Sequence, residues 1–111
     1  MYAALFEMTS WFGLEQFVFT GGSAAELLTE FEEIQSLGCL VRMGRERENA
    51  KGQKMLDKLE DILNKRESGV LTNEDLLTLD IDISLGTIKC VEIAEGDDAV
   101  EQLKAKYPKA K

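Results

Sequence analysis

Apolar and polar positions follow two different periods along the chain, and the segment from Phe17 to Cys39 contains both of them. Phe17 and Phe19 are two residues apart, a spacing typical of one face of a β-strand. After Gly21 and Gly22, apolar residues recur every three or four positions, which predicts an amphipathic helix. These residues are Ala24, Leu27, Leu28, Phe31, Ile34 and Leu37. The segment therefore predicts a strand, a glycine-containing turn and a helix.

Both ends of this helix have sequence signals. Ser23 is followed three residues later by Glu26, which is a capping-box pattern at a helix start. Gly38 is well placed for the left-handed conformation that ends many helices, and Cys39 would then pack back on Ile34. We therefore expect one continuous helix that ends just before Gly38.

The N-terminal part of the chain predicts a hairpin. Residues 2–9 alternate in the manner of a half-buried strand. We expect them to pair with residues 16–20 so that Phe6 lies opposite Phe19 and the aromatic side chains meet across the ladder.

Three further segments have the pattern of strands. Residues 40–43 are short and apolar enough for one strand. Residues 77–85 alternate aliphatic and polar side chains throughout, which predicts a strand with one buried face. Gly86 would turn the chain, and residues 87–94 would return as the partner strand.

Two more helices complete the predicted fold, at residues 50–67 and about 98–107. Thr72 and Asp75 form another N-cap pattern, which implies a short helical turn before Leu77. Together these elements predict an α+β fold, with a mainly antiparallel sheet of about five strands and three helices packed on one face. The 111 residues are the length of a single domain, residues 1–111.

Charge is unevenly distributed along this acidic chain, whose formal net charge is −8. Residues 1–41 contain six acidic residues and no lysine or arginine. Residues 42–66 reverse this balance, with eight basic residues against five acidic ones. Such segregation indicates a polarised surface.

The residue types present exclude several kinds of chemistry. The chain has no histidine, which removes histidine-based triads and the usual imidazole metal ligands. Its two cysteines, Cys39 and Cys90, belong to no metal-binding or redox spacing, and we expect both to be reduced and buried in the core. No pair of carboxylates stands out from the others. We therefore expect no enzymatic activity, no cofactor and no metal.

Two short patterns suggest ligand sites but are incomplete. Residues 20–23 join a strand to a helix start, where backbone N–H groups can hold an anion, but no basic residue precedes Arg42. A glycine hinge with a helix cap explains the same residues. Residues 80–84 have the first spacing of a calcium loop, but Leu85 and Val91 stand where that loop needs glycine and glutamate. A strand explains these residues better.

One basic cluster is present, around a predicted charged loop at residues 44–49. It consists of Arg42, Arg45, Arg47, Lys51 and Lys54. A nucleic-acid site would need these side chains to face outward together and to outweigh the acidic remainder of the chain. Because Glu46 and Glu48 are interleaved with them, local ion pairs explain the run, and we do not expect direct nucleic-acid binding.

Two groups of residues are candidates for contact with a partner protein. Glu26, Glu30 and Glu33 follow one another at four and three residues on the polar side of the first helix. Trp11 and Phe12 stand beside Gly13 in a turn, where they either cap the core or anchor a partner.

These observations favour a small acidic protein-binding regulator or inhibitor. A strongly acidic surface speeds encounter with a basic partner, including a nucleic-acid-binding protein. The N-terminal sequence fits neither a signal peptide nor a membrane span, so we expect a cytoplasmic protein, similar in type to accessory proteins of phages and mobile elements. The alternative is a structural subunit that self-assembles into a homo-oligomer through a sheet edge.

Overall fold

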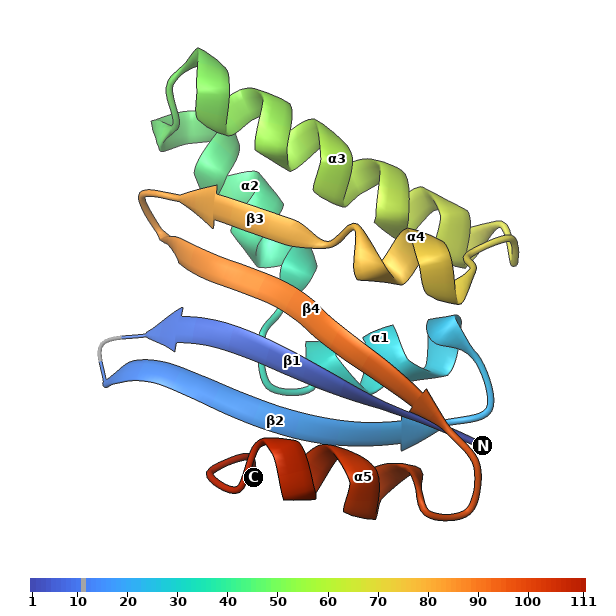
Figure 1. The fold of residues 1–111 in the computed structure, drawn as a ribbon. Helices are drawn as coiled ribbons and strands as arrows, with labels where there is room; N and C mark the ends of the chain where they lie inside the picture. Colours follow the sequence, from blue (N-terminus) through green and yellow to red (C-terminus); the bar gives the residue numbers. More distant parts are fainter. Residues whose placement is uncertain (11) are drawn as a thin grey trace.

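The computed structural model describes residues 1–10 and 12–111 of the chain (Figure 1). Its strands are β1 (Tyr2–Ser10), β2 (Gly13–Gly21), β3 (Asp80–Ile83) and β4 (Gly86–Glu95). Its helices are α1 (Ala24–Glu32), α2 (Leu37–Arg47), α3 (Ala50–Glu67), α4 (Asn73–Leu77) and α5 (Ala99–Lys106). The strands form one antiparallel sheet in the order β2-β1-β4-β3. The α+β class is confirmed, with four strands and five helices in this part of the chain in place of five and three.

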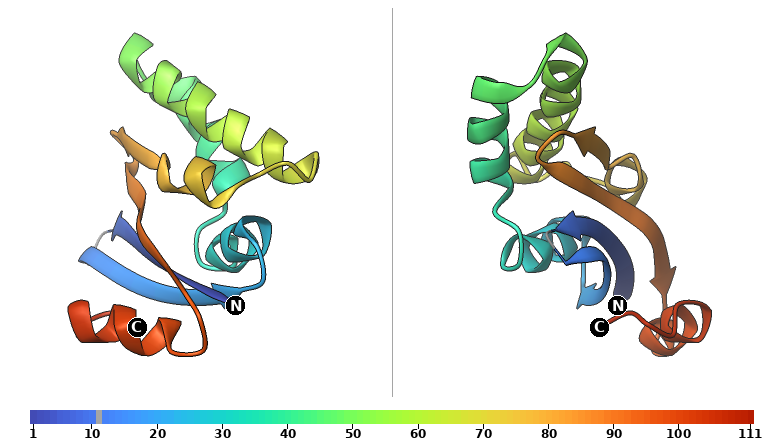
Figure 2. Two further views of the ribbon diagram at one scale, coloured as in Figure 1. Left: turned by 45° about the vertical axis from the view of Figure 1, so that its right-hand side comes forward. Right: turned by 90° about the vertical axis from the view of Figure 1, so that its left-hand side faces the viewer.

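Helices cover both faces of the sheet, which corrects the expectation of a single covered face. Even-numbered residues of β1 such as Phe6 pack with α1, α2 and α3 in the larger core cluster. Ala3 and Leu5 point the other way and pack with Leu103 of α5 in a second cluster. Figure 2 shows α5 on the opposite side of the sheet from α1 and α2. The reason is that residues 2–6 are apolar at every position, which is typical of a strand buried on both faces.

The register of the β1–β2 hairpin differs by two residues from the predicted one. Ser10 lies opposite Gly13, so Phe6 lies opposite Phe17 and Ala4 opposite Phe19. A short connection fixes the register of a hairpin, and this one is shorter than the sequence suggested. The aromatic cluster forms nevertheless, because the Phe6 ring lies 5.9 Å from that of Phe19 and stacks on Phe31 at 4.6 Å.

The single helix expected up to Gly38 is divided in two. α1 ends at Glu32, and Ile34 is 44 % exposed and does not continue the buried stripe. Ser36 then begins α2, because its hydroxyl accepts a hydrogen bond from the Cys39 N–H at 3.3 Å. Gly38 lies inside α2 and does not adopt a positive φ. Residues 40–43, predicted as a strand, are therefore helical.

α3 has the predicted bounds, and α2 packs against it at close range. Gly44 is buried at the contact, and a Cβ at this position would lie 2.6 Å from a Leu56 methyl group. Beside it, Arg45 bonds to Glu60 and Asp57 of α3. A small residue at the crossing thus lets the two helices approach, and an ion-pair network closes its outer side.

The β3–β4 hairpin forms as predicted, but its first strand is shorter. α4 takes the residues up to Leu77, and its capping box between Thr72 and Asp75 is present in both directions. Ile81 and Ile83 are buried along β3, as the alternating pattern predicted, and Leu79 is buried just before it.

Replacing Ile81 with alanine should lower the free energy of unfolding by about 2–5 kcal/mol, because the side chain is fully buried and its loss leaves a cavity. Chemical denaturation measures this change. Asp82→Ala, on the exposed face of the same strand, should change stability by less than about 0.5 kcal/mol. A similar, small effect of both substitutions would contradict the core assignment.

Two glycines of α2 should respond in opposite ways to alanine. Gly38→Ala has open space around its Cβ and should leave stability unchanged or raise it by up to about 1 kcal/mol. Gly44→Ala must displace the buried Leu56 side chain and should be less stable than Gly38→Ala by about 1–3 kcal/mol. Thermal unfolding of the pair checks this, and equal stabilities would show that α2 and α3 do not meet at Gly44.

Candidate functional site

The polar side of α1 presents three glutamates to solvent. Ala24, Leu27, Leu28 and Phe31 are buried against the sheet. Their spacing turns Glu26, Glu30 and Glu33 outward, and all three are exposed. We call these three residues, of which Glu33 is the C-cap directly after α1, the α1 acidic face. Among the salt bridges of the described residues, none includes a member of this face.

More acidic residues lie at the end of the sheet where α1 begins. Tyr2 of β1 pairs with Gly21 on one side and with Glu95 on the other, so the β2–α1 and β4–α5 turns leave the sheet side by side (Figure 1). The second turn carries exposed Asp97 and Asp98 next to Glu95. The α1 acidic face therefore starts at an end of the sheet that is itself acidic.

The two predicted partner-binding groups do not lie together. Phe12 lies in the β1–β2 turn, whereas Glu26 follows the opposite end of β2 (Figure 1). The nine residues of β2 are eight steps of about 3.4 Å each, which place these ends about 27 Å apart. Phe12 is 93 % exposed, so its core-capping interpretation is wrong. Trp11 lies outside the described residues, and its predicted role stays a prediction.

The basic cluster predicted around residues 44–49 is divided by the fold. These residues form the end of α2 and its junction with α3, where the sequence predicted a loop. Arg45 turns inward to α3, and hydrogen bonds to Glu60 and Asp57 raise its pKa. Arg42 points elsewhere, with Nη2 3.1 Å from the Sγ atom of Cys39. The five cations therefore do not form one outward-facing surface.

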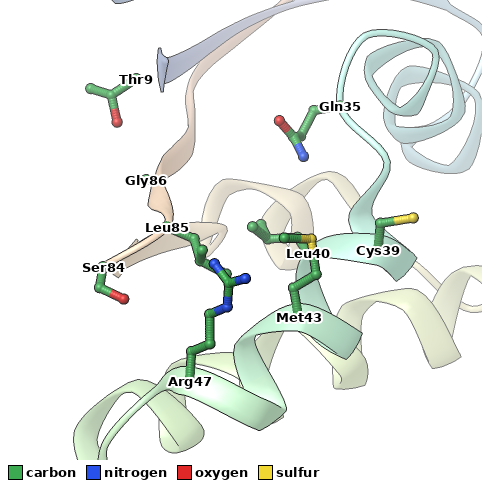
Figure 3. Close-up of a pocket in the computed structure, with 9 residues that line it drawn as sticks. All are labelled: Thr9, Gln35, Cys39, Leu40, Met43, Arg47, Ser84, Leu85 and Gly86. Carbon is green, nitrogen blue, oxygen red and sulfur yellow. The ribbon is translucent and has the colours of Figure 1, made fainter. Parts of the chain in front are cut away.

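An open hollow of about 600 Å³ lies between α2, the end of β1 and the β3–β4 turn (Figure 3). Its walls are apolar at Leu40, Met43 and Leu85, and the Arg47 guanidinium points in between them. Such a surface could accept an apolar side chain of a partner. No sequence pattern indicates this hollow, because its residues come from segments far apart in the chain.

Glu48 fixes one wall of this hollow. Its carboxylate accepts hydrogen bonds from the N–H of Ser84, at 2.9 Å, and from the hydroxyl of the same residue. These bonds lower the pKa of Glu48 and join the α2–α3 junction to the β3–β4 turn. The two bonds thus connect the C-cap residue of α2 to Ser84, which lines the hollow.

The two cysteines have different surroundings, which corrects the expectation that both are core thiols. Cys90 is buried in β4, and burial raises its pKa to about 12. Cys39 is half-buried in the first turn of α2, where the neighbouring Ser36 hydroxyl and then the positive charge of Arg42 lower its pKa. In Figure 3 its sulfur points away from the hollow. Both thiols are free.

The two incomplete ligand patterns are explained by local structure. At the start of α1, the Glu26 carboxylate accepts the N–H of Gly22, so the chain's own anion occupies this helix end. Asp80 and Asp82 lie on β3 with exposed side chains. Within residues 1–10 and 12–111, no group of acidic or cysteine side chains is arranged to hold a metal ion.

Comparison of the chain with protein-family models, with characterised proteins and with solved structures finds no match. Across the described residues, no helix has the length and apolar character needed to cross a membrane.

The cysteines should react at different rates with an alkylating reagent in the native state. Cys39 should react at least about tenfold faster than Cys90, because it is accessible and its pKa is lowered. Mass spectrometry of labelled peptides measures both rates. Cys39→Ser should leave only slow labelling, whereas denaturant should make both sites of the unchanged chain react. Equal native rates would contradict the two environments.

Proposed function

We propose that the protein binds a partner protein with a basic surface through the α1 acidic face and thereby regulates or inhibits it. The observation that carries this proposal is the exposure of Glu26 and Glu30 on α1 and of Glu33 at its C-cap, outside the salt bridges of the described residues. α1 is held by its buried side, so its outer side is presented without rearrangement.

The distribution of the other charges supports the same proposal. Several cations are already bound to acidic side chains of the chain, among them Arg45, Lys65, Arg66, Lys106 and Lys111. On α1 itself Arg66 pairs with Glu32, and the three glutamates of the α1 acidic face lie outside these ion pairs. Clustered charge of one sign attracts an oppositely charged partner and raises the rate of encounter.

A basic surface suited to this face is one that ordinarily contacts nucleic acid. By occupying such a surface, the protein would block nucleic-acid binding by its partner without binding nucleic acid itself. We further propose that it works in the cytoplasm, without catalysis or a cofactor, as an accessory protein of the type found in phages and mobile elements.

The test is the triple substitution Glu26→Gln, Glu30→Gln and Glu33→Gln. The partner is first captured from a lysate of the source cells with the unchanged protein and identified by mass spectrometry. Association and dissociation rates are then measured at low and high salt. We expect the triple variant to associate at least about tenfold more slowly at low salt, with a smaller change in dissociation, because steering acts on encounter.

A matched control makes the same change in net charge elsewhere. Glu46→Gln, Asp80→Asn and Asp82→Asn also raise the formal net charge from −8 to −5, at exposed residues away from α1. This variant should associate nearly as fast as the unchanged protein. Equal slowing in both triple variants would show that total charge matters and that α1 is not the contact surface.

A further inference from the structure

The edge of the sheet formed by β2 is a regular strand with outward-facing backbone groups. Its nine residues pair with β1 one-to-one, without a bulge, from Gly13 to Gly21. Val18 N–H and Gln16 C=O point away from β1, because both bond to Lys111. In an antiparallel strand, the N–H and C=O groups of every second residue point to the same side. The backbone groups of Leu14 and Thr20 therefore point away from β1 as well.

The two edges of the sheet differ in how they are protected. β3 at the other edge has only four residues and carries exposed Asp80 and Asp82, two features that discourage strand pairing. β2 has neither lysine nor proline, and Glu15 is its one ionised residue. Long, regular edges of this kind are templates for a further strand.

One residue of the chain itself occupies the middle of this edge. Lys111 donates its N–H to Gln16 O at 2.9 Å and accepts the Val18 N–H at 3.1 Å. Its side chain reaches Glu15 at 2.8 Å and lies over the Phe17 ring. The segment after α5, residues 107–111, therefore crosses the β2 edge, where Lys111 bonds to the β2 backbone. We call this segment the strap.

We propose that the β2 edge pairs with β2 of a second copy of this chain, in an antiparallel register centred on Phe17, after the strap is displaced. In this register Gln16 of each copy lies opposite Val18 of the other, and Leu14 lies opposite Thr20. All four outward-facing residues then exchange both backbone hydrogen bonds across the two-fold axis. The edge is thus self-complementary, and two sheets become one continuous sheet. This inference is independent of the α1 acidic face.

Charge along the edge favours a second copy as the occupant. Two chains of net charge −8 repel each other over most of their surfaces. Along β2, however, Glu15 is the one ionised residue. The Phe17-centred register also places Glu15 opposite Phe19 of the other copy, so no like charges face each other. The β2 edge is therefore a strip along which two acidic copies can approach.

Paired substitutions at Leu14 and Thr20 test the register, because both side chains are exposed and they would face each other across the two-fold axis. Leu14→Lys with Thr20→Lys places like charges opposite each other twice, and it should weaken the dimer about tenfold. Leu14→Lys with Thr20→Glu places opposite charges there and should keep or strengthen it. The first variant changes the formal net charge from −8 to −6, which reduces the general repulsion between two copies. General repulsion therefore cannot explain a weaker association of this variant.

Sedimentation equilibrium of the full chain and the two double variants gives the monomer–dimer constants, and circular dichroism checks that each is folded. Removal of Lys111 forms a fourth sample and should raise the dimer fraction, because it frees Gln16 O and Val18 N. The proposal is supported if the dimer is weakened by the like-charge double variant and kept by the opposite-charge one. This holds whether the dimer forms in the full chain or only after Lys111 is removed. For this purpose the double substitutions are repeated in the chain without Lys111.

Three results would overturn the proposal. If every sample is monomeric at high micromolar concentration, the edge does not pair with a second copy, and a strand from a different protein becomes the remaining occupant. A dimer that ignores both double variants uses another surface. A dimer that is lost equally in both double variants contradicts the Phe17-centred register.

Discussion

The burial of β1 on both faces is the constraint on which the rest of the structure depends. Residues Ala3 to Phe6 are all completely buried, with Phe6 stacked on Phe31 of α1 and Leu5 packed with Leu103 of α5. Both edges of β1 are also occupied, by β2 and β4. A central strand enclosed in this way has no surface of its own. The surfaces available for function are therefore the outer sides of the helices, the turns and the remaining edges of the sheet.

The sequence predicted those features that depend on neighbouring residues. α3 has the predicted bounds, and the exposure of the α1 acidic face followed from the helical period of the buried residues beside it. The cap at Thr72 and Asp75 is likewise a local signal. The second covered face of the sheet also had a signal, since residues 2–6 contain no polar position. The alternation of residues 2–9, with polar Glu7 and Thr9 on one side, predicts only one buried side.

Other features depend on contacts between distant segments, and the sequence could not supply them. Residues 40–43 are helical because Ser36 starts a new helix and because Gly44 lets that helix pack on α3. From the sequence alone, Gly44 is equally typical of a loop, which is why residues 44–49 are expected to form one. The separation of Phe12 from Glu26 follows from the length and direction of β2. The hollow beside Arg47 exists only after its three lining segments meet.

The net charge acts in opposite directions on the two proposed contacts. Carboxylates attract a basic partner to α1, and added salt screens that attraction. The same charge of −8 opposes the approach of a second copy, so added salt should favour pairing along the nearly neutral β2 edge. At low salt the molecule is thus biased towards a monomer that meets basic partners quickly, with the Lys111 strap in place. Because each contact uses a different element around β1, one can change without disturbing the packing that supports the other.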